Sequence, residues 1–215
     1  MSASRSEAGN GQEKLVQSQL LLGQMFLDRG DPVQAFCHFE TAARSGLPSA
    51  LNMLGRAYER GWGTRRNPSQ AAACFAAAAS GGDGWAMFNL ADLFLTGQGV
   101  DRNRHQACLL YLEAARKGVA KALNMLGLLH EDGISGEPDH DTAWQFFEGA
   151  AAGGDPWGSL NLGRLCLAAG RAGPAARHIS DALQSGNQEV REAAGSLLSG
   201  AADHPALRAL SARCS

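Results

Sequence analysis

The sequence predicts an all-α protein built as an α-solenoid, a linear stack of about five helix-turn-helix hairpins. Three observations predict this fold. A hexapeptide returns unchanged 72 residues further along the chain, small and apolar residues recur at half that step, and within each step the apolar positions follow helical spacing.

The repeat is plainest in a short run of small and apolar residues. ALNMLG occupies residues 50–55 and again residues 122–127. Midway between them, residues 86–91 read AMFNLA, and residues 158–163 read GSLNLG. The pattern thus recurs four times at a step of 36 residues, a length typical of helical-hairpin repeats.

The first half of each unit is expected to be a helix with small residues on its buried face. Ala50, Leu54, Gly55 and Tyr58 lie on one side of a helix with 3.6 residues per turn. Small side chains at Ala50 and Gly55 would let the partner helix approach closely.

The second half of each unit is expected to be a helix that begins with a capping side chain. Asp or Asn recurs at the 36-residue step and can accept a hydrogen bond from a backbone N–H of the first turn; the four positions are Asp31, Asn67, Asn103 and Asp139. The same step carries one aromatic residue per unit for the buried stripe, at Phe39, Phe75, Tyr111 and Phe147. Glycines suited to a left-handed helix end close the units at Gly46, Gly82, Gly118 and Gly154.

These signals divide the chain into three parts. Residues 1–12 are polar and are predicted to be disordered. Residues 13–200 are predicted to form a single solenoid, and residues 201–215 a capping helix over its last open face. The expected repeats are 17–49, 50–85, 86–121, 122–157, 158–189 and a partial unit at 190–200.

The third unit, AMFNLADLFLTGQGVDRNRHQACLLYLEAARKGVAKA, resembles the Sel-1-like repeat family, a subclass of tetratricopeptide-like repeats. It fits the family pattern A-x-x-x-L-G-x-x-Y-x-x-G-x-G-V-x-x-D-x-x-x-A-x-x-x-[YF]-x-x-A-A-x-x-G except for Ala91 in place of Gly and Asn103 in place of Asp. The resemblance covers about residues 17–186. It implies a right-handed superhelix that acts as a protein-binding adaptor, scaffold or regulatory module.

The resemblance also implies a concave groove lined by the first helix of each repeat. The residues it places there are Asn52, Arg56, Arg60, Trp85, Phe88, Asp92, Lys121, Asn124, Leu128, Trp157 and Arg164. Trp85 and Trp157 share one register, and either packing between hairpins or contact with a partner would explain a tryptophan there.

Composition narrows the class of partner. Nineteen Lys and Arg against 21 Asp and Glu give a formal net charge of −2, which supplies no global field for nucleic acid. Arg65, Arg66, Arg102 and Arg104 could form a local basic ridge in the turns, where solubilising charge is the alternative reading. No apolar run approaches the ~18 residues of a membrane span, and the start of the chain lacks a secretory pattern. We expect a cytoplasmic monomer or weak oligomer that binds a protein or peptide.

Neither a cofactor nor a metal site is predicted. The five cysteines form no C-x-x-C pair, and their odd number favours reduced thiols. The turn around residues 130–141 gathers acidic and histidine side chains, for which a solvated acidic loop is favoured over a metal site.

No catalytic motif is present, so we expect no enzyme activity. The alternative is a hydrolase resembling the β-lactamase-like members of the family. Those members carry two cysteines in each repeat, and no repeat here does.

Overall fold

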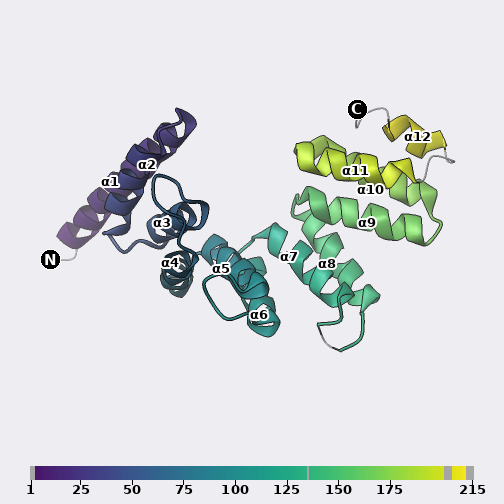
Figure 1. Ribbon diagram of the computed structural model, residues 1–215, viewed down its shortest axis with the longest axis horizontal. Helices are drawn as coiled ribbons and strands as arrows, with labels where there is room; N and C mark the ends of the chain where they lie inside the picture. Colours follow the sequence, from purple (N-terminus) through teal and green to yellow (C-terminus); the bar gives the residue numbers. More distant parts are fainter. Residues whose placement is uncertain (1–2, 135, 201–204, 212–215) are drawn as a thin grey trace. The chain divides into compact units, whose positions relative to one another are not determined.

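The computed structural model describes residues 3–134, 136–200 and 205–211, and the chain is helical with no strand in those ranges (Figure 1). The predicted all-α solenoid is confirmed. Its first ten helices pair into hairpins as α1 (Ala3–Asp28) with α2 (Pro32–Ala43), α3 (Pro48–Arg60) with α4 (Pro68–Ser80), α5 (Gly84–Thr96) with α6 (Arg104–Arg116), α7 (Ala120–Glu131) with α8 (His140–Ala152), and α9 (Pro156–Ala168) with α10 (Ala172–Ser185). The helices α11 (Gln188–Ser199) and α12 (Pro205–Ser211) follow and pack on α10.

The chain divides into two compact units. The first runs from Met1 to Lys117 and contains α1–α6, and the second runs from Gly118 to Ser215 and contains α7–α12. The sequence predicts a single solenoid over residues 13–200, because the 36-residue step continues through Gly118 without a break. The repeat period indicates the fold of each hairpin, but it does not indicate where the chain divides into compact units.

The predicted capping residues start the second helices of four hairpins. In each case a side-chain oxygen accepts a hydrogen bond from the backbone N–H three residues later, which satisfies one orphan donor of the first turn. The N···O distances are 3.1 Å for Asp31, 3.1 Å for Asn67, 2.9 Å for Asn103 and 3.0 Å for Asp139.

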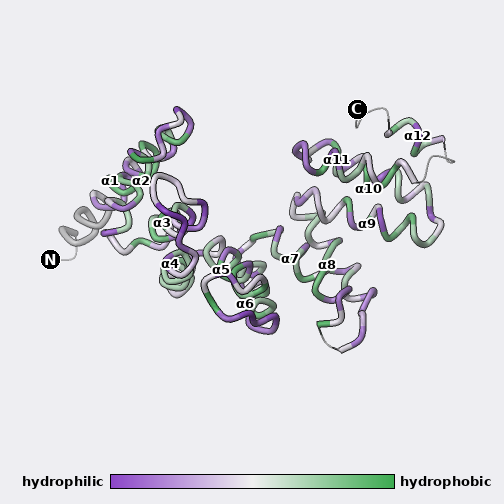
Figure 2. Tube along the Cα trace, in the orientation of Figure 1, coloured by the Kyte–Doolittle hydropathy of each residue, from purple (hydrophilic) through white to green (hydrophobic). Residues whose placement is uncertain are grey.

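In the hairpins α1–α2, α3–α4 and α7–α8, a glycine in the first helix lets an aromatic ring of the second helix fill the space between them. The rings of Phe75 and Phe147 are fully buried. A Cβ placed on Gly55 would lie 2.6 Å from the Phe75 ring, and one on Gly127 would lie 2.4 Å from the Phe147 ring. Both separations are too short for any side chain, so the glycines set the distance between the paired helices. Figure 2 shows how hydrophobic and hydrophilic positions alternate along the helices.

The ends of the chain differ in part from expectation. Disorder is predicted for residues 1–12, whereas α1 begins at Ala3 and runs unbroken to Asp28. No proline interrupts this segment, so a helix nucleated by the first hairpin extends toward the N-terminus. In the predicted cap, α12 buries Leu207 and Leu210 against a cluster formed with α10 and α11. Residues 201–204 and 212–215 of that prediction lie outside the described residues.

Candidate functional site

Two of the candidate groove residues belong to amide pairs that link successive first helices. In the first unit, Asn52 of α3 is buried, and its Oδ1 accepts a hydrogen bond from Nδ2 of Asn89 in α5 at 2.9 Å. In the second unit, Asn124 of α7 is buried and accepts from Asn161 of α9 at 2.8 Å. Each pair satisfies polar groups that would otherwise be costly to bury. The donors Asn89 and Asn161 are absent from the predicted site.

The aromatic candidates of α5 form a small stack with one exposed end. The Trp85 side chain is 54% exposed, and its ring centroid lies 5.9 Å from that of Phe88. Phe88 is only 4% exposed, and its ring lies 5.5 Å from that of Tyr111 in α6. About half of the Trp85 side chain is therefore open to solvent, and its ring packs on the buried Phe88 ring.

Asp92 fixes the inner end of the same stack. The Tyr111 hydroxyl donates a short hydrogen bond to Oδ1 of Asp92. Burial first, and the neighbouring Asp92 carboxylate second, raise the pKa of Tyr111 well above its ordinary value. Tyr111 consequently stays protonated and remains a donor to Asp92, which anchors α5 to α6.

The C-terminal end of α3 presents exposed arginines beside an indole. The Arg56 guanidinium carbon lies 5.2 Å from the centroid of the Trp62 ring, a cation–π arrangement. Arg60 is exposed and forms an ion pair with Glu59, with Nε 3.8 Å from Oε2. Trp62 lies outside the predicted site, and the signal for it was an aromatic residue inside the glycine-bounded turn at 61–63.

In the second unit, Arg164 of α9 binds back to α7. Its Nη2 lies 2.5 Å from Oε2 of Glu131, and its Nε donates to Oδ1 of Asn161 at 3.2 Å. The Asn124–Asn161 amide pair and this ion pair together hold α7 against α9. Arg164 thus has a structural role whether or not it also meets a ligand.

The remaining groove candidates of the second compact unit differ from one another in burial and in the residues that they contact. Burial raises the pKa of Asp155, and the hydrogen bond from the Gly158 backbone and the charge of exposed Lys121 oppose this effect. Leu128 packs on the cluster that contains Phe147. Trp157 is half-buried against the cluster of α9, α10 and α11, whereas Trp85 in the same register is exposed.

Two of the turn arginines bind backbone carbonyls of the preceding helices, and Arg66 also donates from Nη2 to Oε1 of Gln98 in the next turn. Arg66 donates from Nε to the carbonyl of Glu59 at 3.0 Å, and Arg102 donates to the carbonyl of Leu95 at the same distance. These carbonyls lie at the C-terminal ends of α3 and α5, where backbone acceptors lack helical partners. The two arginines therefore serve as caps rather than as a free basic ridge.

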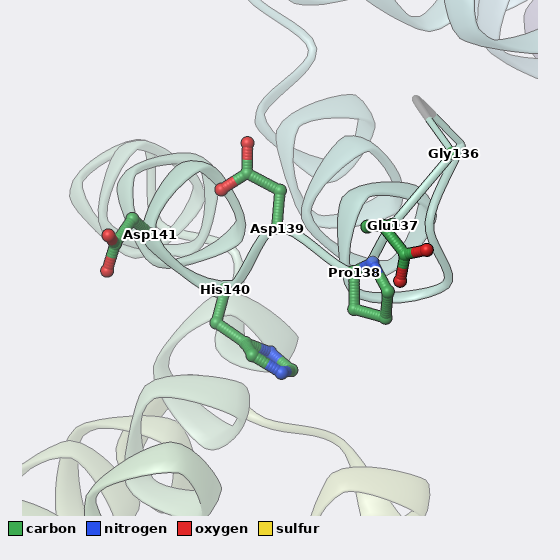
Figure 3. A pocket seen from close by; sticks show the side chains of 6 residues that line it. All are labelled: Gly136, Glu137, Pro138, Asp139, His140 and Asp141. Carbon is green, nitrogen blue, oxygen red and sulfur yellow. The ribbon is translucent and has the colours of Figure 1, made fainter.

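The acidic turn between α7 and α8 lines an open pocket (Figure 3). Its side chains point in different directions, away from a common centre. Asp139 caps α8, and the hydrogen bonds from Thr142 lower the pKa of its carboxyl group. Among the described residues, no group of three or more His, Cys, Asp or Glu side chains could hold a metal ion.

The cysteines give a pH-dependent prediction. Cys37 is exposed, Cys166 is buried, and burial raises the pKa of the half-buried Cys74 and Cys108 thiols. A raised pKa keeps a thiol protonated to higher pH, and the thiolate is the reactive form. We expect iodoacetamide to alkylate Cys37 first and Cys166 only after unfolding. The Cys74 and Cys108 rates should rise only at a higher pH than the rate of an unperturbed thiol.

Peptide mass spectrometry of the alkylated protein measures these rates, and the same reaction in denaturant provides the control. Equal rates at all four sites in the folded protein would contradict the burial that the structure assigns to them. Cys214 lies outside the described residues.

Within the described part of the chain, no helix combines the length and apolarity needed to cross a bilayer.

Comparison with known proteins gives one family. The model of the Sel1 repeat matches residues 16–47, 48–83, 86–119 and 120–155, which together make up more than half of the chain. No curated protein matches in sequence.

Solved structures with the same architecture are similar over most of the chain. A Sel1 repeat protein from Oxalobacter formigenes has 26% identity and a TM-score of 0.78, with 92% of this chain and 84% of that one covered. A protective antigen of uropathogenic Escherichia coli, c5321, has 25% identity and a TM-score of 0.68, with 86% and 41% covered. The immunity protein Pa5087 from Pseudomonas aeruginosa has 24% identity and a TM-score of 0.56 over 69% of this chain and 57% of that one, a likeness of fold.

Proposed function

Because this chain belongs to the Sel1 repeat family, we propose that it is a non-enzymatic adaptor that holds a protein or peptide on its first helices. Sel1 repeat proteins generally mediate contacts between proteins. The hydrolase alternative has no specific observation in its favour among the described residues. The four described cysteines are free thiols, which supports a reducing, cytoplasmic location as part of the same proposal.

The observation that carries the proposal is the exposed Trp85 on a rigid part of the first unit. An exposed, supported tryptophan is the kind of residue that anchors protein interfaces. Its helix is joined to α3 through the Asn52–Asn89 amide pair and to α6 through Asp92 and Tyr111. The surface is thus preorganised, which lowers the entropic cost of binding.

The chemistry of the partner follows from the spacing along α3 and α5. Trp85 is the second residue of α5, and Arg56 is the ninth residue of α3, the first helix of the preceding hairpin. The two positions are seven residues apart in the repeat, so the side chains lie on the same face of their respective helices. At a rise of 1.5 Å per residue, they differ by about 10 Å along the helix direction. We propose a protein segment that presents an apolar side chain to Trp85 and a carboxylate to Arg56 and Arg60.

The first step of the test identifies the partner. A photo-crosslinking amino acid at Ser49, the exposed α3 counterpart of Trp85, should capture a protein from extracts of the source organism, and mass spectrometry identifies it. The same label at exposed Leu109 on α6 is the control and should capture less of it.

Calorimetry with that partner then tests the surface. We expect Trp85→Ala to weaken binding about tenfold or more, because a buried indole contact is lost. Arg56→Ala combined with Arg60→Ala should weaken it most at low salt. Phe88→Ala and Asn124→Ala are unsuitable probes, since both side chains are buried within their units.

Arg65→Ala on the exposed turn serves as the matched control and should bind normally. If Arg65→Ala lost affinity while Trp85→Ala kept it, the binding surface would lie on the turns and the proposed site would be wrong.

A further inference from the structure

The first helix exposes three leucines, and one of them, Leu21, lies between two charged residues on one side of the helix. Leu15 and Leu21 of α1 are each 63% exposed, and Leu22 is 36% exposed. Lys14 and Asp28 lie in the same region of the helix surface, and Ser18, also exposed, lies between them. Seven residues make about two helical turns, so Lys14, Leu21 and Asp28 share one side of α1.

Corresponding positions in the next hairpin are covered. Gly23 of α1 packs on the Phe39 ring as Gly55 of α3 packs on Phe75, which aligns the two helices. In this alignment Leu22 corresponds to Leu54, which is 9% exposed because α3 packs against the hairpin before it. On α1, no other helix of the first compact unit covers the equivalent face. A surface built like a hairpin junction therefore lies open to solvent.

The opposite side of α1 is already occupied by its own hairpin. The Gln19 side chain lies 2.7 Å from Nδ1 of His38 in α2, and the Phe26 ring stacks on the His38 ring at 5.2 Å. Val16 is buried with Ala42 and Ala50. The side of α1 that carries Leu21 remains accessible to a second molecule.

The charges show which occupant fits. Lys14 precedes Leu21 by seven residues and Asp28 follows it by seven. If two copies of α1 run antiparallel with Leu21 at the two-fold axis, each lysine lies opposite the aspartate of the other copy, about 10 Å from the axis. The two Leu21 side chains then meet at the axis, and the small Ser18 permits a close approach. Gln24 donates a hydrogen bond to Asp28 at 2.8 Å, which holds this carboxylate on the helix surface.

We propose that this chain forms a two-fold symmetric homodimer through antiparallel pairing of α1, with Leu21 at the axis and reciprocal Lys14–Asp28 ion pairs. The arrangement is isologous, because the same patch serves both subunits. A single helix from each side buries less than a standard interface, so the dimer forms at concentrations of tens of micromolar. This inference is independent of the partner surface on α3 and α5.

Sedimentation velocity on the full chain at low salt tests the proposal. Between about 5 and 200 μM, the mass should rise from the 22.5 kDa monomer toward twice that value. Leu21→Lys places two ammonium groups at the axis and should keep the chain monomeric throughout this range. Leu109→Lys, an equally exposed leucine on α6, is the control and should leave the dimer unchanged.

A charge-swap cycle tests the antiparallel register. Lys14→Glu brings like charges together at both ends and should weaken association about tenfold, and Asp28→Lys should do the same. Both substitutions in one chain restore opposite charges and should restore the dimer, which is the signature of a self-complementary pair. Circular dichroism confirms that each variant stays folded.

Three outcomes would overturn the proposal. They are a chain that stays monomeric at every concentration, a dimer that Leu109→Lys disrupts as strongly as Leu21→Lys does, and a double swap that fails to recover what the single swaps lose.

Discussion

Replacing Phe147 by alanine is expected to lower the free energy of unfolding by about 3–5 kcal/mol. The ring is fully buried and joins α8 to both of its neighbours: it packs on Gly127 of α7 and shares a cluster with Leu162 of α9. Its removal leaves a cavity that two helices would have to move together to close. Urea denaturation followed by circular dichroism measures the change.

Phe146→Ala is the matched control at the adjacent position. Its ring is half-buried and lies 5.2 Å from the His130 ring. We expect this variant to lower the free energy of unfolding by less than about half as much as Phe147→Ala does, because less apolar area leaves water on folding. Equal losses for the two variants would contradict the assignment of Phe147 as the residue that fills this hairpin.

The features predicted correctly from the sequence are those that one hairpin determines by itself. The cap at Asn67 is an example, since it needs only the backbone three residues on. The ring of Phe75 is another, because its place over Gly55 follows from two periodic patterns in one repeat. Such local relations leave the same trace in every copy, and a period of 36 makes them visible.

The roles of the site residues depend on neighbouring repeats, and there the period misleads. Asn52 is predicted as a groove residue, but its amide partner Asn89 lies 37 positions away, one residue more than the repeat period of 36. Trp85 and Trp157 share a register, yet Trp157 packs on the cluster around Ile179 while Trp85 is exposed. Residues at the same position of different repeats contact different side chains, so the repeat position alone does not determine whether a residue packs or binds.

Adding a side chain to Gly127 tests the spacing between α7 and α8 from the α7 side of its contact with Phe147. We expect Gly127→Val to lower the free energy of unfolding by about 3 kcal/mol. A Cβ at this position would lie 2.4 Å from the Phe147 ring, which is enclosed on all sides and cannot swing away. Gly11, where an added Cβ meets nothing within 4 Å, provides the control, and Gly11→Ala should cost no stability.

The double variant Gly127→Val with Phe147→Ala separates steric overlap from other causes. In this chain the new side chain grows into the space that the ring vacates, so the two losses should add up to more than the loss of the double variant. For residues in direct contact, a coupling of about 1–3 kcal/mol is expected, measured by urea denaturation of all four chains. Strict additivity would mean that Gly127 is required for a reason other than the ring. The close approach of α7 to α8 would then have to be explained by backbone packing alone.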